Sequence, residues 1–384
     1  MNTKTDSTLN IGIVGLGRMG QRHAEQLALR TRGARLVAAC SPVESERLLN
    51  IGVVGLGRMG QRHAEQLALR TRGARLVAAC SPVAAERDWA RDQLGVAALY
   101  EDDAALLRDP QVHAVVISSP TTLHADQTIA ALEAGKHVFV EKPLALDVPS
   151  CERVEAVARR HPALVAMVGF VRRFDAHYLE AKAQIDAGRI GRPFLVRSQT
   201  CDMNDPDGFF VRFAPTSGGI FLDCSVHDID VARWMLGNPK ALRVFASGTI
   251  ALHPGLAACG DVDNGLAIVE FEGGARAQFF ASRTMAHGFE ASSEIIGTAG
   301  SVSVGVGAHR DRVQSRDAAG VHHRVLVDFV ERFAEAFQRE MAAFVAACKG
   351  ETPSPLSLAD ATEATRIGVA ITKSLKSGQV QDVV

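Results

Sequence analysis

Hydrophobic residues between Asn50 and Gly169 gather in short runs that are apolar throughout. Examples are NIGVV, ARLVAAC, HAVVIS and KHVFV, whose β-branched residues favour strands. Between such runs lie segments with helical spacing of apolar positions, such as AAERDWARDQLG, whose final Gly95 is a natural helix end. Strands that are apolar on both faces and alternate with helices are typical of a parallel sheet covered on both sides. The pattern predicts a doubly wound α/β domain over residues 50–169.

The pattern changes over residues 170–384. The stretches RPFLVRSQT, ALRVFASGTI, GLAIVEFEGG, ARAQFFASRT and SSEIIGTAGSVSVG are longer and often alternate in polarity, which indicates an antiparallel sheet with one covered face. Gly273 and Gly274 predict a hairpin turn between two of them. Helices are expected over residues 218–236, 327–350 and 357–378, the last with Ser357 as its N-cap. We therefore expect a second, α+β domain with a large, mostly antiparallel sheet.

A near-perfect repeat opens the chain. Segments 10–43 and 50–83 differ only in that Ile13 stands in the first where Val53 stands in the second. Only the second copy continues directly into the remaining strands. If the first copy supplied the first strand, the whole second copy would bulge from inside the domain, which costs chain entropy. We expect residues 1–49 to be an appended, non-functional copy.

Composition narrows the classes of partner. The chain has 384 residues, 47% of them hydrophobic and 22% charged, with a formal net charge of -1. This balance gives no general attraction to nucleic acid or to an anionic membrane. The sequence lacks an apolar run near the roughly 18 residues that a membrane helix needs, and its N-terminus lacks the apolar core of a signal peptide. We expect a cytoplasmic protein that binds neither nucleic acid nor membrane.

The run GLGRMG fits the pattern G-x-G-x-x-G at Gly55, Gly57 and Gly60. A strand pattern precedes it and a helix pattern follows, which is the context that dinucleotide binding requires. The first glycine permits a tight turn, the second lets the backbone approach a pyrophosphate, and the third allows close packing of helix on strand. The helix N-terminus supplies amides and a positive dipole end. The sequence predicts a dinucleotide site at the second copy.

The residues at the ribose end of this site do not decide between NAD and NADP. Domains that prefer NAD usually carry an acid about 20 residues past the glycines, where it holds the ribose hydroxyls. Here the sequence is Ala79-Cys80-Ser81-Pro82, without a carboxylate. Arg87 is the nearest possible partner for a 2′-phosphate. Both NAD and NADP therefore remain candidates.

Candidate chemistry lies at two places. Lys142, in EKPLAL, follows a predicted parallel strand, and ligands of such sheets bind beyond the carboxyl ends of the strands. Asp223 and His227 are four residues apart on one predicted helix face, with Asp230 three residues further. A carboxylate beside an imidazole can orient it and raise its basicity, although a simple surface pair has the same spacing. Further His or Cys at ligand spacing is lacking, so we expect no metal.

These motifs together resemble a known family. GLGRMG, then EKPLAL, then GGxxxDxxxHxxD at residues 218–230, followed by a mostly antiparallel sheet, is similar to the Gfo/Idh/MocA oxidoreductases. The resemblance covers Asn50 to the C-terminus, and MVGFVRRFDAHY is similar to the inositol dehydrogenase branch. It implies a Rossmann domain, a sheet domain whose open face mediates assembly into a dimer or tetramer, and hydride exchange between a nicotinamide and a cyclitol or sugar carbinol.

The resemblance also implies residue roles. Lys142, Asp223 and His227 match the catalytic set, and they form the expected substrate site together with Arg172. His227 would be the general base, Lys142 would stabilise charge on the reacting oxygen, and Asp223 would orient His227 or bind a neighbouring hydroxyl. The expected cofactor contacts are Gly55, Gly57, Arg58, Met59, Gly60, Ser81, Ser119, Pro120, His124, Glu141 and Lys142. Alternatives are a dehydrogenase of another sugar or diol, and a catalytically silent NAD(P)-binding regulator.

Overall fold

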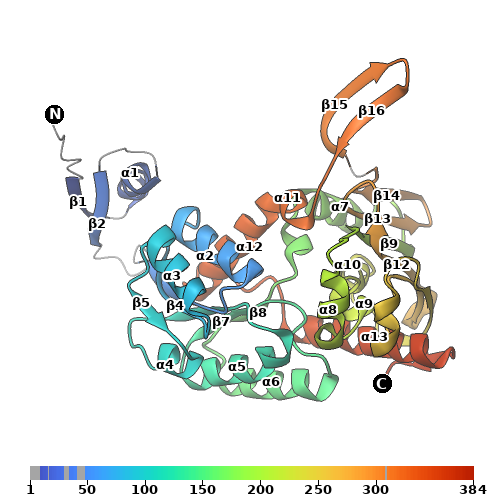
Figure 1. The fold of residues 1–384 in the computed structure, drawn as a ribbon, viewed down its shortest axis with the longest axis horizontal. Helices are drawn as coiled ribbons and strands as arrows, with labels where there is room; N and C mark the ends of the chain where they lie inside the picture. The colour runs from blue at the N-terminus through green and yellow to red at the C-terminus, as the bar shows by residue number, and fades with distance from the viewer. Residues whose placement is uncertain (1–8, 16, 30–33, 41–47, 308) are drawn as a thin grey trace.

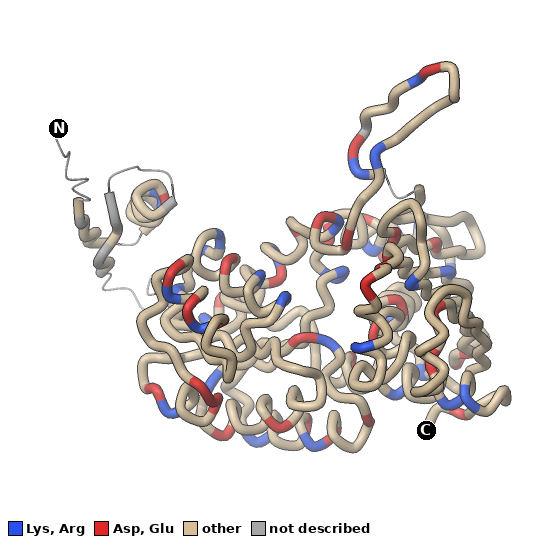
Figure 2. Tube along the Cα trace, viewed as in Figure 1, with Lys and Arg blue, Asp and Glu red and all other residues tan. Residues whose placement is uncertain are grey.

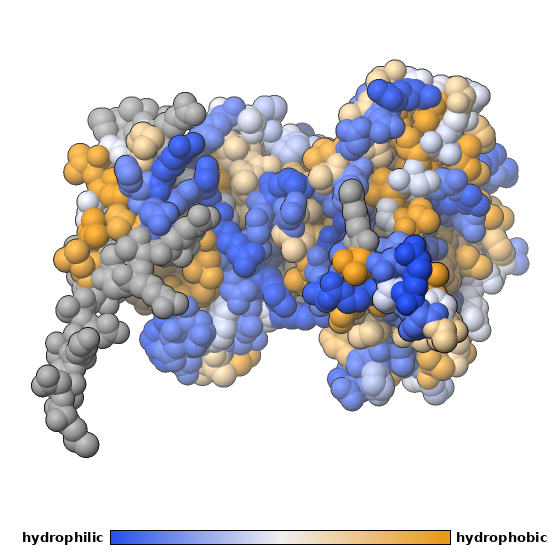
Figure 3. Space-filling view, turned by 90° about the horizontal axis from the view of Figure 1, so that it is seen from above, coloured by the Kyte–Doolittle hydropathy of each residue, from blue (hydrophilic) through white to orange (hydrophobic). Residues whose placement is uncertain are grey.

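The computed structural model describes residues 9–15, 17–29, 34–40, 48–307 and 309–384. Two domains lie side by side, the first built on a parallel sheet and the second on a larger sheet (Figure 1). Lys and Arg are interspersed with Asp and Glu over both domains (Figure 2). Seen from above, hydrophilic residues gather in the middle of the molecule, between its two halves (Figure 3).

The first domain is the predicted doubly wound sheet. Its six parallel strands run in the order β5-β4-β3-β6-β7-β8. Strand β3 is central. Its adjacent residues Val53 and Val54 lie on opposite faces of the sheet and are 0% and 3% exposed. Burial on both faces explains the uninterrupted apolar runs of the sequence. The strands are β3 (Leu49–Val54), β4 (Ala74–Cys80), β5 (Ala98–Tyr100), β6 (Ala114–Ile117), β7 (His137–Val140) and β8 (Ala166–Val168).

Helices with local end signals connect these strands. Gly95, with φ 68°, ends the helix after β4 as predicted, because the left-handed conformation suits glycine. The side chains of Asp102 and Asp147 accept backbone N–H groups and begin two others. The helices are α2 (Arg58–Leu69), α3 (Ala84–Leu94), α4 (Asp103–Leu107), α5 (Thr121–Glu133) and α6 (Val148–Arg160).

The second domain contains a seven-stranded sheet in the order β14-β13-β9-β12-β11-β10-β17. Strands β9 and β12 pair in parallel and the other neighbours are antiparallel, which confirms the predicted sheet. Gly273 and Gly274, at φ 75° and 84°, form the predicted turn between β11 and β12. The strands are β9 (Pro193–Met203), β10 (Ala241–Thr249), β11 (Asn264–Phe271), β12 (Arg276–Met285), β13 (Glu290–Gly297), β14 (Gly300–Val304) and β17 (Gln381–Asp382).

One face of this sheet is covered and the other is open. In β11, Ala267 is 2% exposed, whereas its neighbours Leu266 and Ile268 are 50% and 52% exposed. Helix α13 (Leu358–Ser377) packs on the covered face, where its Ser374 accepts a hydrogen bond from the Ala246 amide of β10 at 2.9 Å. The alternating polarity of the sequence reflects this two-sided environment.

The last helix begins as predicted. The Ser357 hydroxyl accepts the Asp360 amide, and the Asp360 carboxylate accepts the Ser357 amide, which together form a capping box. The second domain also contains helices α7 (Ala176–Asp186) and α8 (Phe209–Ser217) and the 3-10 turns η2 (Val171–Phe174), η3 (Pro254–Cys259) and η4 (Glu272–Gly274).

Two predicted helices are interrupted. The helix expected over residues 218–236 divides into α9 (Ile220–Asp223) and α10 (Val226–Met235). The Ser225 amide bonds the Ile220 carbonyl at 3.3 Å, one residue further back than in an α-helix, so the turn is widened. The helix expected over 327–350 divides into α11 (Phe329–Arg332) and α12 (Ala334–Cys348).

A projecting hairpin escaped prediction. Strands β15 (His309–Asp317) and β16 (Gly320–Val325) pair with each other and extend away from the second domain (Figure 1). Their side chains are mostly polar and exposed, so the alternation that marks a half-buried strand is weak here.

The first repeat copy has a fold of its own. Strands β1 (Leu9–Val14) and β2 (Ala34–Cys40), with α1 (Arg18–Leu29), form a separate two-stranded parallel sheet. Leu9 and Val14 are 63% and 88% exposed, whereas the matching Leu49 and Val54 are 8% and 3% exposed. Nearly identical local sequences therefore lie in two different surroundings. That the first copy is non-functional stays a prediction.

Helices long and apolar enough to cross a membrane are lacking among the described residues. The expected cytoplasmic location stays a prediction.

Candidate active site

The turn after β3 has the shape that dinucleotide binding requires. A Cβ at Gly55, where φ is 86°, would lie 2.7 Å from the Ser119 amide nitrogen, and one at Gly60 would lie 1.8 Å from the Gly55 carbonyl oxygen. A Cβ at Gly57 would meet no atom of the described chain within 4 Å. Gly55 and Gly60 thus close the turn, and Gly57 leaves space at the N-terminus of α2. This space fits the pyrophosphate of a dinucleotide.

Other expected cofactor residues meet this turn at the carboxyl edge of the sheet. Ser119 and Pro120 follow β6, and Ser119 Oγ donates to Gln127 Oε1 at 2.5 Å. The Arg58 guanidinium lies over the Phe209 and Phe329 rings, 5.7 and 5.1 Å from their centroids. These rings belong to α8 and α11, so Arg58 links the turn to helices that follow the first domain in sequence. Met59 packs partly buried against the core.

His124 and Glu141 point inward. The His124 ring nitrogens lie 2.8 Å from the Pro143 carbonyl oxygen and 2.9 Å from that of Ser119, and burial lowers the pKa of His124. Burial opposes ionisation of Glu141, but His63, with Nε2 2.6 Å from Glu141 Oε1, together with Lys142 and His124 outweighs burial and lowers the Glu141 pKa. Both residues thus support the turn around Lys142. Their contact with a cofactor stays a prediction.

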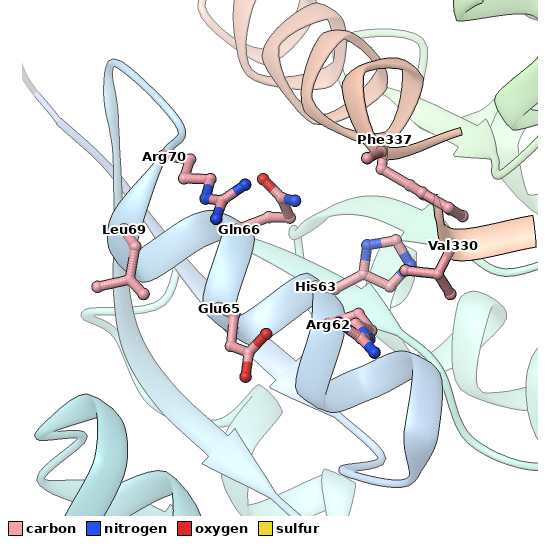
Figure 4. A pocket seen from close by; sticks show the side chains of 9 residues that line it. Arg62, His63, Glu65, Gln66, Leu69, Arg70, Val330 and Phe337 are labelled. Atoms are coloured by element: carbon pink, nitrogen blue, oxygen red, sulfur yellow. The ribbon is translucent and has the colours of Figure 1, made fainter. Parts of the chain in front are cut away.

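A small pocket opens on the flank of α2, toward α11 and α12 (Figure 4). Its lining includes His63 together with Arg62, Glu65, Gln66, Leu69, Arg70, Val330, Ala334 and Phe337. This lining contains none of the residues expected in the active site. The pocket therefore reveals the neighbourhood of His63 and does not mark the catalytic centre.

The ribose end of the site contains a carboxylate that sequence reasoning missed. Ser81, 1% exposed, follows β4 and donates its hydroxyl to Glu86 Oε2 at 2.5 Å. Arg87 donates to the Ser81 carbonyl at 2.6 Å and to Glu101 Oε1 at 2.7 Å. The Arg87 guanidinium is thus already occupied, against its expected availability to a phosphate. Glu86 lies in α3, and its position in the sequence does not show that its side chain reaches back to the end of β4.

Lys142 joins the two domains. Its Nζ donates to the Asp223 carbonyl oxygen at 2.8 Å and lies 3.5 Å from Asp223 Oδ1. Asp223 Oδ2 accepts from Arg283 at 3.1 Å, and Arg283 donates to Asp261 Oδ2 at 2.8 Å. Burial raises the Asp223 pKa, but Lys142 and Arg283 outweigh burial and leave it below its usual value. The Asp223 carboxylate is therefore ionised near neutral pH.

The structure shows no hydrogen bond between Asp223 and His227 among the described residues. The carboxylate of Asp223 is held by Lys142 and Arg283, and the turn between α9 and α10 is widened, so that Asp223 orients His227 stays a prediction. Asp230 is also outside the site, because it accepts both hydrogen bonds of a buried pair with Arg173, at 2.8 and 2.6 Å. Four-residue spacing predicts a shared face only along an uninterrupted α-helix.

His227 has a surrounding that favours the neutral ring. Its Nδ1 is buried without a hydrogen-bond partner in the described part of the chain. Burial, followed by the positive charges of Lys142 and Arg172, lowers the His227 pKa well below 6.5. A neutral imidazole can accept a proton.

Arg172 is 1% exposed and is fixed by two hydrogen bonds. Its Nη1 donates to Asp228 Oδ1 at 2.7 Å and its Nη2 to Thr200 Oγ1 at 2.5 Å. The structure therefore places Arg172 beneath the site, where its charge acts on His227. Direct contact with a substrate stays a prediction.

Asp202 is a further acid that sequence reasoning did not single out. It lies in β9, and its Oδ2 is 3.6 Å from the Cys224 sulfur, which is 3.7 Å from Asp223 Oδ2. Burial and the charge of Asp223 raise the Asp202 pKa to about 6. Only the tertiary fold brings these two acids, which belong to separate elements, to the same thiol. Groups of three or more His, Cys, Asp or Glu able to hold a metal are lacking among the described residues.

Two family models match the chain. Residues 49–170 match the model described as "Oxidoreductase family, NAD-binding Rossmann fold". Residues 178–303 match the model described as "GFO/IDH/MocA C-terminal domain". The first model thus covers the whole parallel sheet, and the second covers most of the larger sheet but not β17.

Two curated relatives match over nearly their full length. The chain is 38% identical to the scyllo-inositol 2-dehydrogenase (NAD(+)) of Bacillus subtilis, covering 95% of this chain and 94% of that protein. It is 32% identical to the myo-inositol 2-dehydrogenase of Thermotoga maritima, covering 96% of each. Among solved structures, scyllo-inositol dehydrogenase from Lactobacillus casei with bound NAD(H) and scyllo-inositol is 37% identical, with a TM-score of 0.85 over 88% of this chain and 99% of that one.

Proposed function

Because the chain belongs to the Gfo/Idh/MocA family of oxidoreductases, we propose that it is an NAD-dependent dehydrogenase of a cyclitol such as inositol. One observation carries the proposal: Lys142 lies at the carboxyl edge of the parallel sheet and holds Asp223, close in sequence to His227. The names of the relatives support inositol as the class of substrate.

The residues suit oxidation of a secondary alcohol. A bound nicotinamide supplies the acceptor for the hydride that leaves the carbon. His227, neutral near pH 7, takes the proton of the hydroxyl group. Lys142 donates a hydrogen bond to the same oxygen and stabilises its developing negative charge. Asp223, held ionised, positions Lys142 and accepts a hydrogen bond from a neighbouring hydroxyl.

Glu86 supports a preference for NAD over NADP. Its carboxylate reaches Ser81, at the strand end where an acid usually holds the ribose hydroxyls. The same negative charge repels a 2′-phosphate, and Arg87 is occupied by Ser81 and Glu101. The proposed preference thus comes from a side chain outside the usual position.

Glu86→Gln tests this preference. We expect wild-type protein to have the higher kcat/KM with NAD, and the variant to reduce the ratio of NAD to NADP values by about tenfold, the size of one lost charge contact. Asp88→Asn, on the same helix with a half-exposed side chain, is the matched control and should leave the ratio unchanged. A ratio that is equal in wild type and Glu86→Gln would contradict the role of Glu86.

We also propose that the protein is a homo-oligomer. The open face of the second sheet exposes Phe245, Leu266 and Ile268 at 43%, 50% and 52%. Such apolar side chains on one continuous face favour burial against a second copy of the chain.

A substrate panel tests the proposed reaction. Inositol isomers, aldoses and acyclic diols are offered with NAD and with NADP, and the absorbance of reduced nicotinamide is followed. We expect turnover of at least one inositol with NAD. Cofactor binding without turnover of any compound would indicate a regulator, and turnover of aldoses or acyclic diols alone would contradict the cyclitol.

A further inference from the structure

Asp202 stands beside the proposed catalytic residues on a separate element. It belongs to β9, whereas Lys142 follows β7 and Asp223 ends α9. The Cys224 thiol lies between the two acids, 3.6 Å from Asp202 Oδ2 and 3.7 Å from Asp223 Oδ2. Three chain segments thus bring two carboxylates and one ammonium to the same place.

Asp202 differs from the neighbouring acids in its hydrogen bonds. Asp223 accepts from Lys142 and Arg283, and Asp261 accepts from Arg283 and from the Ile220 amide at 3.0 Å. In the described structure, Asp202 accepts only from the Cys224 thiol, a weak donor. A partly exposed carboxylate without a strong donor retains capacity for a ligand hydroxyl.

We propose that Asp202 binds substrate by accepting a hydrogen bond from a hydroxyl next to the reacting carbinol, and so selects vicinal hydroxyls. This inference rests on the proposed function. A substrate without that hydroxyl leaves the carboxylate without this partner, which a site built for hydrogen bonding penalises. Asp202 is thus a specificity-determining residue, while Lys142 and His227 act on the reacting oxygen.

The surroundings of Asp202 also predict a pH dependence of the reaction. Burial and Asp223 raise its pKa to about 6, Lys142 and Arg283 oppose this, and Cys224 donates to it. The ionised form, which is the stronger acceptor, therefore predominates above pH 6 and is protonated below it. We expect kcat/KM for the cyclitol to fall as the pH decreases through about 6.

Asp202→Asn is the main test, with an inositol that wild type oxidises and its analogue lacking the neighbouring hydroxyl. We expect the variant to lose about 10- to 100-fold in kcat/KM on inositol, the cost of one charged hydrogen bond. On the deoxy analogue, the variant should lose no kcat/KM relative to wild type. The decrease through pH 6 should disappear in the variant. Asp207→Asn, an exposed acid of the loop that follows β9, is the control.

The outcomes separate this inference from the proposed function. Absence of cyclitol turnover by wild type overturns both. Normal wild-type turnover with an unchanged Asp202→Asn overturns the inference alone, as does an equal loss on inositol and on the deoxy analogue. If Asp202→Asn fails to fold, by its thermal unfolding, Asp202→Ala undergoes the same comparison and decides the inference on the same criteria.

Discussion

At the scale of single residues, Lys142 and His227 are the groups closest to the proposed chemistry. We expect His227→Ala to lower kcat by about 10²- to 10⁴-fold, because it removes the general base. Lys142→Ala should lower kcat by about 10²- to 10³-fold, because it removes a donor to the reacting oxygen. Steady-state kinetics measure both effects. Lys240→Ala, an exposed lysine of the second domain, is the control, and unchanged rates in the first two variants would contradict the mechanism.

Glu340 gives a prediction about stability. It is buried, both carboxylate oxygens lack a partner within the described residues, and burial and Glu141 raise its pKa well above 4.5. The unfolded chain ionises this group near pH 4.5 and the folded protein does so only at higher pH. The protonated Glu340 carboxyl therefore contributes stability that is fully present below pH 4.5. This contribution is lost progressively as the pH rises toward the folded-state pKa.

Glu340→Gln should remove that loss, because glutamine stays neutral. We expect its free energy of unfolding in urea to exceed that of wild type at pH 8, with a smaller difference at pH 5. Glu335→Gln, 80% exposed on the same helix, should behave as wild type. A Glu340→Gln protein that is less stable than wild type at both pH values would show that the carboxyl group has a favourable partner.

At the scale of elements, the phosphate-binding turn occurs twice in the sequence, but its two copies have different surroundings. The Gly55 turn lies against Ser118 and Ser119, whereas Gly15 has no described atom within 4 Å of its Cβ position. We expect Gly57→Val to abolish NAD binding while the fold persists, because its side chain would enter the open space at α2. Gly17→Val should bind NAD as wild type does. Titration with NAD, followed by fluorescence or calorimetry, measures both, and equal loss would contradict the assignment.

At the scale of the whole molecule, the open sheet face should hold copies together. Ile268→Arg places a charge in the middle of this face, and burying an unpaired charge is costly. We expect the variant to sediment as a smaller species than wild type. Leu69→Arg is the control, because it places the same charge at a leucine of α2 that is 46% exposed, and it should leave the assembly unchanged. A wild-type monomer, or an Ile268→Arg protein of unchanged mass, would contradict the proposed interface.

Patterns within single elements were predicted well from the sequence. The apolar runs of the first domain, the Gly273–Gly274 turn and the Ser357 cap all depend on neighbours in sequence, so local rules suffice. The β15–β16 hairpin was missed because its exposed strands lack a buried face and hence an alternating pattern.

The sequence by itself determined the two sheets, the phosphate turn and the positions of Lys142 and His227, because burial period, glycine geometry and short motifs are local properties. The tertiary structure alone decided which charges meet. Asp223 pairs with Arg283, 60 residues away, and not with His227, because β12 and the widened turn after α9 set their places. Glu86 and Asp202 joined the site for the same reason: electrostatic partners depend on distance in space, which sequence spacing does not give.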